Sequence, residues 1–101
     1  ARQFHQSTPS THPLSPSAWS AAQYRSAWDC LKAALASAGM TPAYLVRMNF
    51  YTTDVDAFMA AAEEIMPIHV AEGAQIVATL LGVTRLYDPA IMIEIEATAV
   101  A

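Results

Sequence analysis

Apolar side chains recur every three or four residues between Ser20 and Gly39, which predicts a helix with one buried face. The apolar stripe consists of Tyr24, Ala27, Trp28, Leu31, Leu35 and Ala38. Ser20 and Gln23 have the spacing of a capping box, and Gly39 supplies the left-handed residue at which helices commonly end. We therefore expect the helix to begin near Ser20 and to end at Gly39.

Strand patterns occur at three later places in the chain. The run from Tyr44 to Thr52 is rich in β-branched and aromatic residues, which favours a strand. Its expected faces are Val46, Met48 and Phe50 on one side and Arg47, Asn49 and Tyr51 on the other. Residues 75–83 form a short apolar run closed by Gly82, so we expect a buried strand there. Residues 91–100 alternate between two faces, which is the clearest strand pattern in the sequence.

A second helix is expected between the first two of these strands. Asp54 and Asp56 place acceptors and negative charge where a helix begins. The apolar stripe runs from Phe58 to Met66, and Pro67 is expected to stop the helix, so that residues 67–74 form a connection. The order from Ser20 is then α-β-α-β-β, which indicates an α+β fold.

The first twenty residues differ from the rest of the chain. Three X-Pro steps, at Pro9, Pro13 and Pro16, push the preceding residues out of the helical region. Five serines and two of the three histidines accompany them. We expect residues 1–20 to be an irregular arm and residues 21–101 to form the folded domain.

Composition limits the function of the domain. A chain of 101 residues holds one domain, and a composition of 54% hydrophobic and 14% charged residues is more apolar than a small monomer needs, which favours subunit contacts. A net charge of −4 and five scattered Lys and Arg residues disfavour nucleic-acid binding. No apolar run is long enough to span a membrane, no signal-peptide pattern precedes the domain, and Cys30 is the single cysteine. We expect a cytoplasmic protein that binds no membrane.

Strings of residues in the last four-fifths of the chain resemble the Rid family, the YjgF-like reactive intermediate deaminases that were once described as endoribonucleases. The first is Ala22-Gln23-Tyr24-Arg25, with Ala38-Gly39-Met40 at the end of the same helix. The second is Val46-Arg47-Met48-Asn49-Phe50-Tyr51-Thr52-Thr53-Asp54. The most specific is Gly82-Val83-Thr84-Arg85-Leu86, a six-residue gap, and Ile93-Glu94-Ile95-Glu96-Ala97-Thr98-Ala99-Val100.

The resemblance implies an α+β subunit similar to chorismate mutase. It also implies a homotrimer whose clefts between subunits hold a small-molecule ligand. The family hydrolyses reactive enamines and imines, such as 2-aminoacrylate, to ketoacids and ammonia, and the resemblance implies no cofactor.

Three positions carry the site that the resemblance implies. Glu94 corresponds to the family glutamate that handles the proton, although a solvated strand face would also explain it. Ala78 stands where the family has an arginine that clamps the substrate carboxylate, and alanine offers no donor. Arg85 is a candidate contact for an anionic ligand, with a structural ion pair to Glu94 or Glu96 as the simpler interpretation.

Other reactive side chains have simpler interpretations. Cys30 is expected to be a buried structural thiol, and Lys32 lies on a helix surface rather than in an apolar pocket. His5, His12 and His69 have no ligand-like spacing, so we expect no metal.

Three functions follow from the sequence. The first is a Rid-like hydrolase of a small imine or enamine, atypical because of Ala78. The second is a non-catalytic trimer that binds metabolites or serves as a structural subunit. The third, a ribonuclease, rests on family naming alone and is disfavoured by the net charge of −4.

Overall fold

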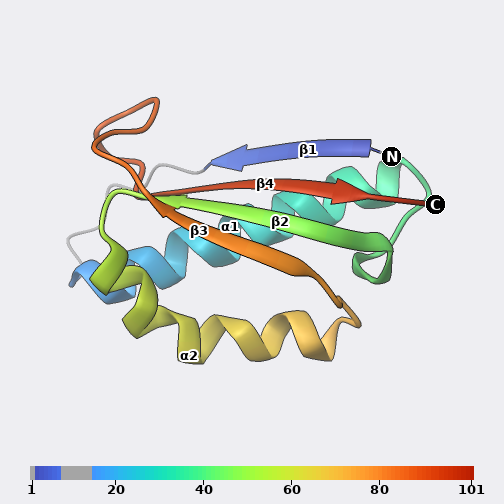
Figure 1. Cartoon of the computed structure of the whole chain (residues 1–101), viewed down its shortest axis with the longest axis horizontal. Helices are drawn as coiled ribbons and strands as arrows, with labels where there is room; N and C mark the ends of the chain where they lie inside the picture. Colours follow the sequence, from blue (N-terminus) through green and yellow to red (C-terminus); the bar gives the residue numbers. More distant parts are fainter. Residues whose placement is uncertain (1, 8–14) are drawn as a thin grey trace.

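The computed structural model describes residues 2–7 and 15–101. Two helices and four strands make up this part of the chain, with a short 3-10 turn at Pro42–Tyr44 (Figure 1). The helices are α1 (Pro16–Ser37) and α2 (Val55–Ala71), and the strands are β1 (Arg2–Ser7), β2 (Leu45–Thr52), β3 (Val77–Gly82) and β4 (Ile93–Ala99). The sheet order is β1-β4-β2-β3. The α+β fold expected from the sequence is confirmed, and no described helix has the length and apolarity that crossing a membrane requires.

Both helices share one core with a single face of the sheet. On β4 the alternation is complete, because Ile93, Ile95 and Ala97 are buried while Glu94 and Glu96 lie on the other face. The largest core side chains are Tyr24, Trp28, Leu31 and Leu35 of α1, Phe58 and Ile65 of α2, Met48 and Phe50 of β2, and Ile93 and Ile95 of β4. The expected placing of Tyr24 and Trp28 in the core is therefore confirmed.

The expectation of an irregular segment is wrong for the described residues before Ser20. Residues Arg2–Ser7 form β1, which pairs antiparallel with β4, so that Arg2 lies opposite Ala99. The sequence gives no strand pattern there because the pairing depends on a strand at the far end of the chain. Helix α1 begins at Pro16, since proline is tolerated in the first turn, and Ser15 accepts a hydrogen bond from the amide of Ala18 at 3.4 Å. The other two X-Pro steps lie outside the described residues.

Ser20 consequently lies inside α1, where it is buried, and the expected capping box is wrong. The end of this helix was predicted correctly, because Gly39 follows it with a φ of 73°. Helix α2 also begins as predicted: the side chain of Asp54 accepts a hydrogen bond from the amide of Ala57 at 2.9 Å.

Helix α2 continues through Pro67 to Ala71, so the expected stop at Pro67 is wrong. Proline removes one helical hydrogen bond, which disfavours but does not prevent a helix. The turn beyond Pro67 carries Ile68, which packs against the core, and His69, which is buried. Burial of these two side chains against α1 and the sheet offsets the lost hydrogen bond.

Strand β3 lies at the edge of the sheet, and the expectation that it is buried is wrong for the single chain. It pairs in parallel with β2 after the crossover through α2, and Val77 and Leu81 are 73% and 42% exposed. An apolar run of this length has the same sequence pattern in a central strand and in an edge strand that a second subunit covers. The single chain therefore leaves apolar surface at this edge.

Strand β2 contains an irregularity that changes its expected faces. The register with β4 shifts between Leu45 and Arg47, so that Val46 is 45% exposed while Leu45 is buried. A bulge of this kind inserts one residue and reverses the alternation on one side of it. Met48 and Phe50 face the core as predicted, but Val46 does not.

Candidate functional site

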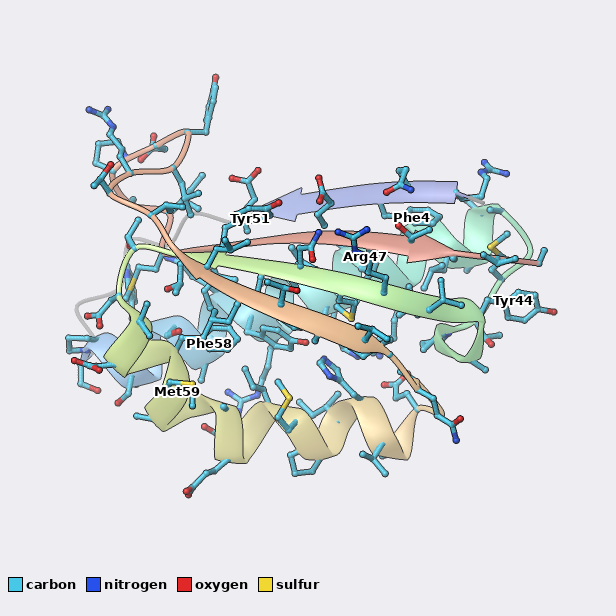
Figure 2. All side chains as sticks on the ribbon, in the orientation of Figure 1. Phe4, Tyr44, Arg47, Tyr51, Phe58 and Met59 are labelled. Atoms are coloured by element: carbon cyan, nitrogen blue, oxygen red, sulfur yellow. The ribbon has the colours of Figure 1, made fainter. Side chains whose placement is uncertain are left out.

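A polar cluster lies on the sheet face away from the helices. The carboxylate of Glu96 accepts hydrogen bonds from Nδ2 of Asn49 at 2.9 Å and from the hydroxyl of Tyr51 at 3.2 Å (Figure 2 labels Tyr51). Burial raises the pKa of Tyr51, and the negative charge of Glu96 raises it further. Tyr51 is therefore a protonated hydrogen-bond donor at neutral pH, and Glu96 is held by two side chains of β2.

Glu94 occupies the next outward position on β4. It is half-buried, and it lies opposite Tyr51 of β2 and opposite Ser7 of β1 in the sheet register. Its negative charge is close enough to contribute to the raised pKa of Tyr51. The structure thus places the predicted acid–base residue on an inner strand of the sheet, on the open face and at the end where β4 begins.

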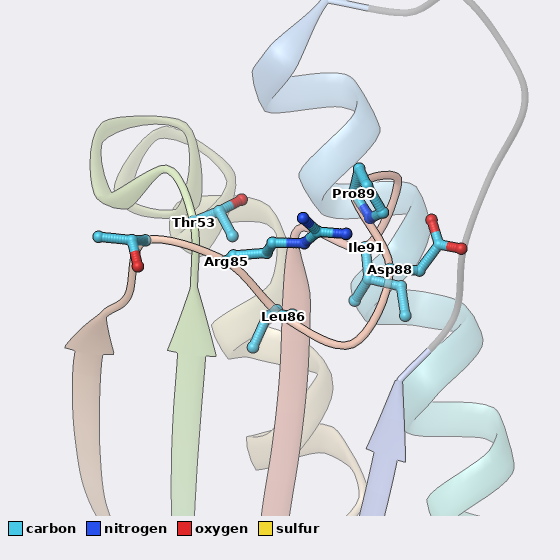
Figure 3. A pocket seen from close by; sticks show the side chains of 7 residues that line it. Thr53, Arg85, Leu86, Asp88, Pro89 and Ile91 are labelled. Carbon is cyan, nitrogen blue, oxygen red and sulfur yellow. The ribbon is translucent and has the colours of Figure 1, made fainter.

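A hollow of about 220 Å³ lies at the same end of the sheet (Figure 3). It is lined by Thr53, Thr84, Arg85, Leu86, Asp88, Pro89 and Ile91. The Arg85 side chain extends past Thr53 toward Pro89 and Ile91, and Asp88 lies on the far side (Figure 3). Within residues 2–7 and 15–101, Arg85 forms no ion pair, so the interpretation of Arg85 as a partner of Glu94 or Glu96 is not supported. Its guanidinium keeps the donors that pair with a carboxylate.

Gln23 of α1, which the sequence placed in a capping box with Ser20, holds the loop that carries Arg85. Gln23 of α1 donates from Nε2 to the carbonyl of Ala90 at 2.8 Å, and its Oε1 accepts from the amide of Met92 at 2.7 Å. Asp88 closes the turn by accepting from the amide of Ala90 at 2.8 Å. Gln23 is buried. The signal in the sequence was a glutamine next to Tyr24 and four residues before Ala27, on the apolar face of the helix, because a buried amide needs hydrogen-bond partners.

Ala78 lies away from these groups. In the parallel register it is opposite Met48, whose side chain faces the helices, whereas Glu94 is opposite Tyr51 on the open face. One chain therefore does not bring position 78 and Glu94 together on one surface.

The remaining candidates are distributed over the two helices. Cys30 is exposed on α1, between the buried residues Trp28 and Leu31, so the expectation of a buried thiol is wrong. Lys32 lies on the surface as predicted and donates to Glu72 at 2.8 Å, a hydrogen bond that raises the pKa of Lys32. Among the described residues, no three His, Cys, Asp or Glu side chains form a group that could hold a metal ion.

The sequence matches a known protein family over most of its length. The sequence model of the family described as endoribonuclease L-PSP matches residues 6–101. The chain belongs to this family. Within the endoribonuclease L-PSP family, the fold is the chorismate-mutase-like α+β fold of the YjgF and Rid proteins. None of the curated proteins compared with the sequence matches it.

Solved structures agree with this assignment. The chain is similar to a member of the YjgF/YER057c/UK114 family from Mycobacterium tuberculosis, with 28% identity, a TM-score of 0.75, and coverage of 95% of this chain and 75% of that one. It is similar to the YjgF gene product of E. coli, with 28% identity, a TM-score of 0.72, and coverage of 79% and 63%. It is also similar to a Rid family protein of unknown function from Yersinia pestis, with 26% identity, a TM-score of 0.71, and coverage of 98% and 78%. The chain thus spans less than two thirds of the E. coli protein.

Proposed function

We propose that the chain is a hydrolase of small reactive imines or enamines, with Glu94 as the acid–base group and Arg85 as the group that holds an anionic part of the substrate. Membership of the endoribonuclease L-PSP family and the resemblance to Rid proteins support the reaction class. The position of Glu94 on the open face of an inner strand, opposite Tyr51, supports the choice of acid–base residue.

The observation that carries this proposal is that Glu94 and the Arg85 hollow share one end of the sheet. Thr53, which lines the hollow, donates from its amide to the carbonyl of Met92 at 3.1 Å. Glu94 follows Met92 by two residues on β4. A substrate at this end of the sheet can therefore be approached by a carboxylate from the strand and by a guanidinium from the loop.

In the proposed reaction, an enamine first becomes the imine, because Glu94 moves one proton from the nitrogen to the carbon. A water molecule then adds to the carbon of the C=N bond, and Glu94 takes a proton from this water. Glu94 returns this proton to the nitrogen, and then takes the proton of the new hydroxyl group and delivers it to the nitrogen as the C–N bond breaks, so that a carbonyl compound and ammonia leave. Glu94 ends the cycle in its starting protonation state, and the sum is one imine plus one water to one carbonyl product plus ammonia.

The same proposal includes assembly into a homotrimer in the cytoplasm, with the ligand in clefts between subunits. The exposed apolar residues at the β3 edge, Val77 and Leu81, favour contact with another copy. A cleft between subunits can also bring position 78 of one copy toward Glu94 of its neighbour, which one chain cannot do.

The second candidate is a trimeric protein that binds small metabolites without catalysis, or that serves a structural role. Ala78 favours it, because the resemblance implies an arginine at this position and alanine has no donor for a carboxylate. The two candidates predict the same assembly and differ in whether ammonia is produced.

The test is ammonia release from freshly generated 2-aminoacrylate. The unmodified protein is expected to accelerate release, and Glu94→Gln is expected to reduce the rate about 10²–10⁴-fold because it keeps the shape and removes proton transfer. Arg85→Met is expected to raise KM more than it lowers kcat, since it removes a binding contact. Asp29→Asn, an exposed change on α1, is the control for loss of a carboxylate and should retain full activity.

Two results would decide against catalysis. If the protein does not accelerate ammonia release, or if Glu94→Gln changes only stability, the non-catalytic candidate is supported. Single-stranded RNA is tested in parallel, and its cleavage by the unmodified protein but not by Glu94→Gln would favour the ribonuclease candidate.

A further inference from the structure

The outer surface of α2 exposes apolar side chains that no described part of the chain covers. Met59 and Val70 are 57% and 77% exposed, and Met66 lies between them at 37% (Figure 2 labels Met59). Their spacing of seven and four residues places them along one stripe of the helix. This stripe faces away from the core, which receives Phe58 and Ile65 from the same helix.

The C-terminal half of the stripe forms an open groove of about 660 Å³. Glu63, Met66, Pro67, Val70 and Ala71 line it, so its walls are apolar except for one carboxylate. All five residues belong to α2, so the groove is wide and shallow and follows one face of this helix. Methionine is the side chain that adapts most easily to partners of different shape, which suits Met66 to a binding surface.

Two hydrogen-bond acceptors lie beside these apolar walls. The carboxylate of Glu63 forms no hydrogen bond or ion pair with another described residue, whereas the neighbouring Glu64 pairs with Arg25. The backbone carbonyl of Glu63 lacks its usual helical donor, because residue 67 is proline and has no N–H. The groove therefore offers acceptors and negative charge next to an apolar surface, and it offers no cation.

We propose that this groove binds a basic amphipathic helix of a partner protein, which inserts apolar side chains between Met66 and Val70 and donates a hydrogen bond from a Lys or Arg to Glu63. A second copy that docks through its own α2 is a poor occupant, because α2 contains no Lys or Arg and a twofold contact would bury two Glu63 carboxylates without a cation. An anionic membrane surface is disfavoured by the same carboxylate. The proposal does not depend on the proposed hydrolase, because the groove lies on the outer helix and Glu94 lies on the open sheet face.

The test uses fluorescence anisotropy with two labelled 18-residue helical peptides, one built from Leu and Lys and one from Leu and Glu in the same amphipathic pattern. The Leu/Lys peptide is expected to bind in a salt-dependent manner, and the Leu/Glu peptide is expected not to bind. Glu63→Gln should weaken binding about three- to tenfold by removing one charged acceptor. Val70→Lys, at an exposed site that folding tolerates, should abolish binding because it places a cation in the groove.

Glu64→Gln is the matched control, because it removes the same charge one residue away from the groove and should leave the affinity within twofold. Equal weakening by Glu63→Gln and Glu64→Gln would overturn the proposal in favour of unspecific charge attraction. Binding that survives Val70→Lys, or no binding of the Leu/Lys peptide, would also overturn it. Loss of self-association in Val70→Lys without any peptide binding would identify a second copy as the occupant.

Discussion

The hydroxyl of Tyr24 on α1 is hydrogen-bonded to Nε2 of His69 on α2, in the centre of the core. Both residues are buried, with His69 only 4% exposed. The rings of Trp28 and Phe50 enclose the imidazole at centroid distances of 4.6 and 6.1 Å. The bond joins the two helices at a point where an unpaired imidazole nitrogen would be costly.

Burial lowers the pKa of His69 below the ordinary value of 6.5. The unfolded chain therefore binds this proton more readily than the folded chain, so the contribution of neutral His69 is fully present above pH 6.5 and is lost as the pH falls through that value toward the folded pKa. We expect the free energy of unfolding to fall between pH 7.5 and pH 5.5, with a slope that approaches about 1.4 kcal/mol per pH unit. Urea denaturation at several pH values measures it. In His69→Leu, the unfolding free energy should depend much less on pH over this range. An unchanged dependence in that variant would mean that other titratable side chains cause it.

Gln23 is expected to be as important for stability as a core residue, although it is polar. Gln23→Ala leaves the carbonyl of Ala90 and the amide of Met92 without their side-chain partner, which should cost about 2–4 kcal/mol of unfolding free energy. Gln3→Ala is the control, because Gln3 is exposed and its bond to Thr98 should contribute less than about 0.5 kcal/mol. Equal effects of the two changes in urea denaturation would contradict the assigned role.

Pro67→Ala is expected to stabilise the protein. Alanine restores the amide that can donate to the carbonyl of Glu63 and has the highest helix propensity, so an increase of about 1–3 kcal/mol is expected. Thermal denaturation measures the shift in Tm. A lower Tm in this variant would mean that the proline ring makes contacts that outweigh the missing hydrogen bond.

Ala78→Arg tests where a substrate carboxylate is held. If clefts between subunits form the site, the new guanidinium should increase the affinity for carboxylated imines about ten- to a hundredfold, as expected for 1.5–3 kcal/mol from a charge-assisted pair. Ala36→Arg adds the same charge on the exposed surface of α1 and should not increase affinity. Steady-state ammonia release gives the change in KM for both variants, and no difference between them would favour Arg85 as the sole anchor.

Leu81→Lys tests the proposed assembly. Leu81 is exposed at the edge of the single chain, so the change should leave the fold intact and weaken subunit contact. Sedimentation velocity at micromolar concentration is expected to give the mass of three chains for the unmodified protein and a smaller species for the variant. A stable monomer for the unmodified protein would rule out the trimer.

The sequence was sufficient to predict the elements whose signals are local. The alternation of β4, the cap at Asp54 and the end of α1 just before Gly39 all depend on residues within a few positions of one another. The features that were missed depend on distant partners. Strand β1 exists because β4 lies beside it, and α2 passes Pro67 because Ile68 and His69 have a core to enter.

In the candidate site too, the sequence predicts the features that depend on local pattern and misses those that depend on distant contacts. Glu94 could be placed on the polar face of its strand because the strand pattern is strictly periodic. Arg85 could be placed only in a loop, and its hollow depends on Thr53 and on the anchoring by Gln23, which are far from it in sequence. The separation of Ala78 from Glu94 follows from the sheet register, which the sequence pattern alone does not determine.

The pairing of Arg2 with Ala99 has a consequence for the order in which the molecule folds. The β2–α2–β3 unit joins neighbours in the sequence, whereas β1 must find a partner almost a whole chain length away. Closing so long a loop costs entropy before any contact compensates for it, so β1 should be the last strand to dock and the first to detach. Each detachment leaves the outer edge of β4 open, and the amides of β1 should exchange with solvent before those of β2. Strand β1 therefore controls how often the sheet exposes an edge that another strand can join.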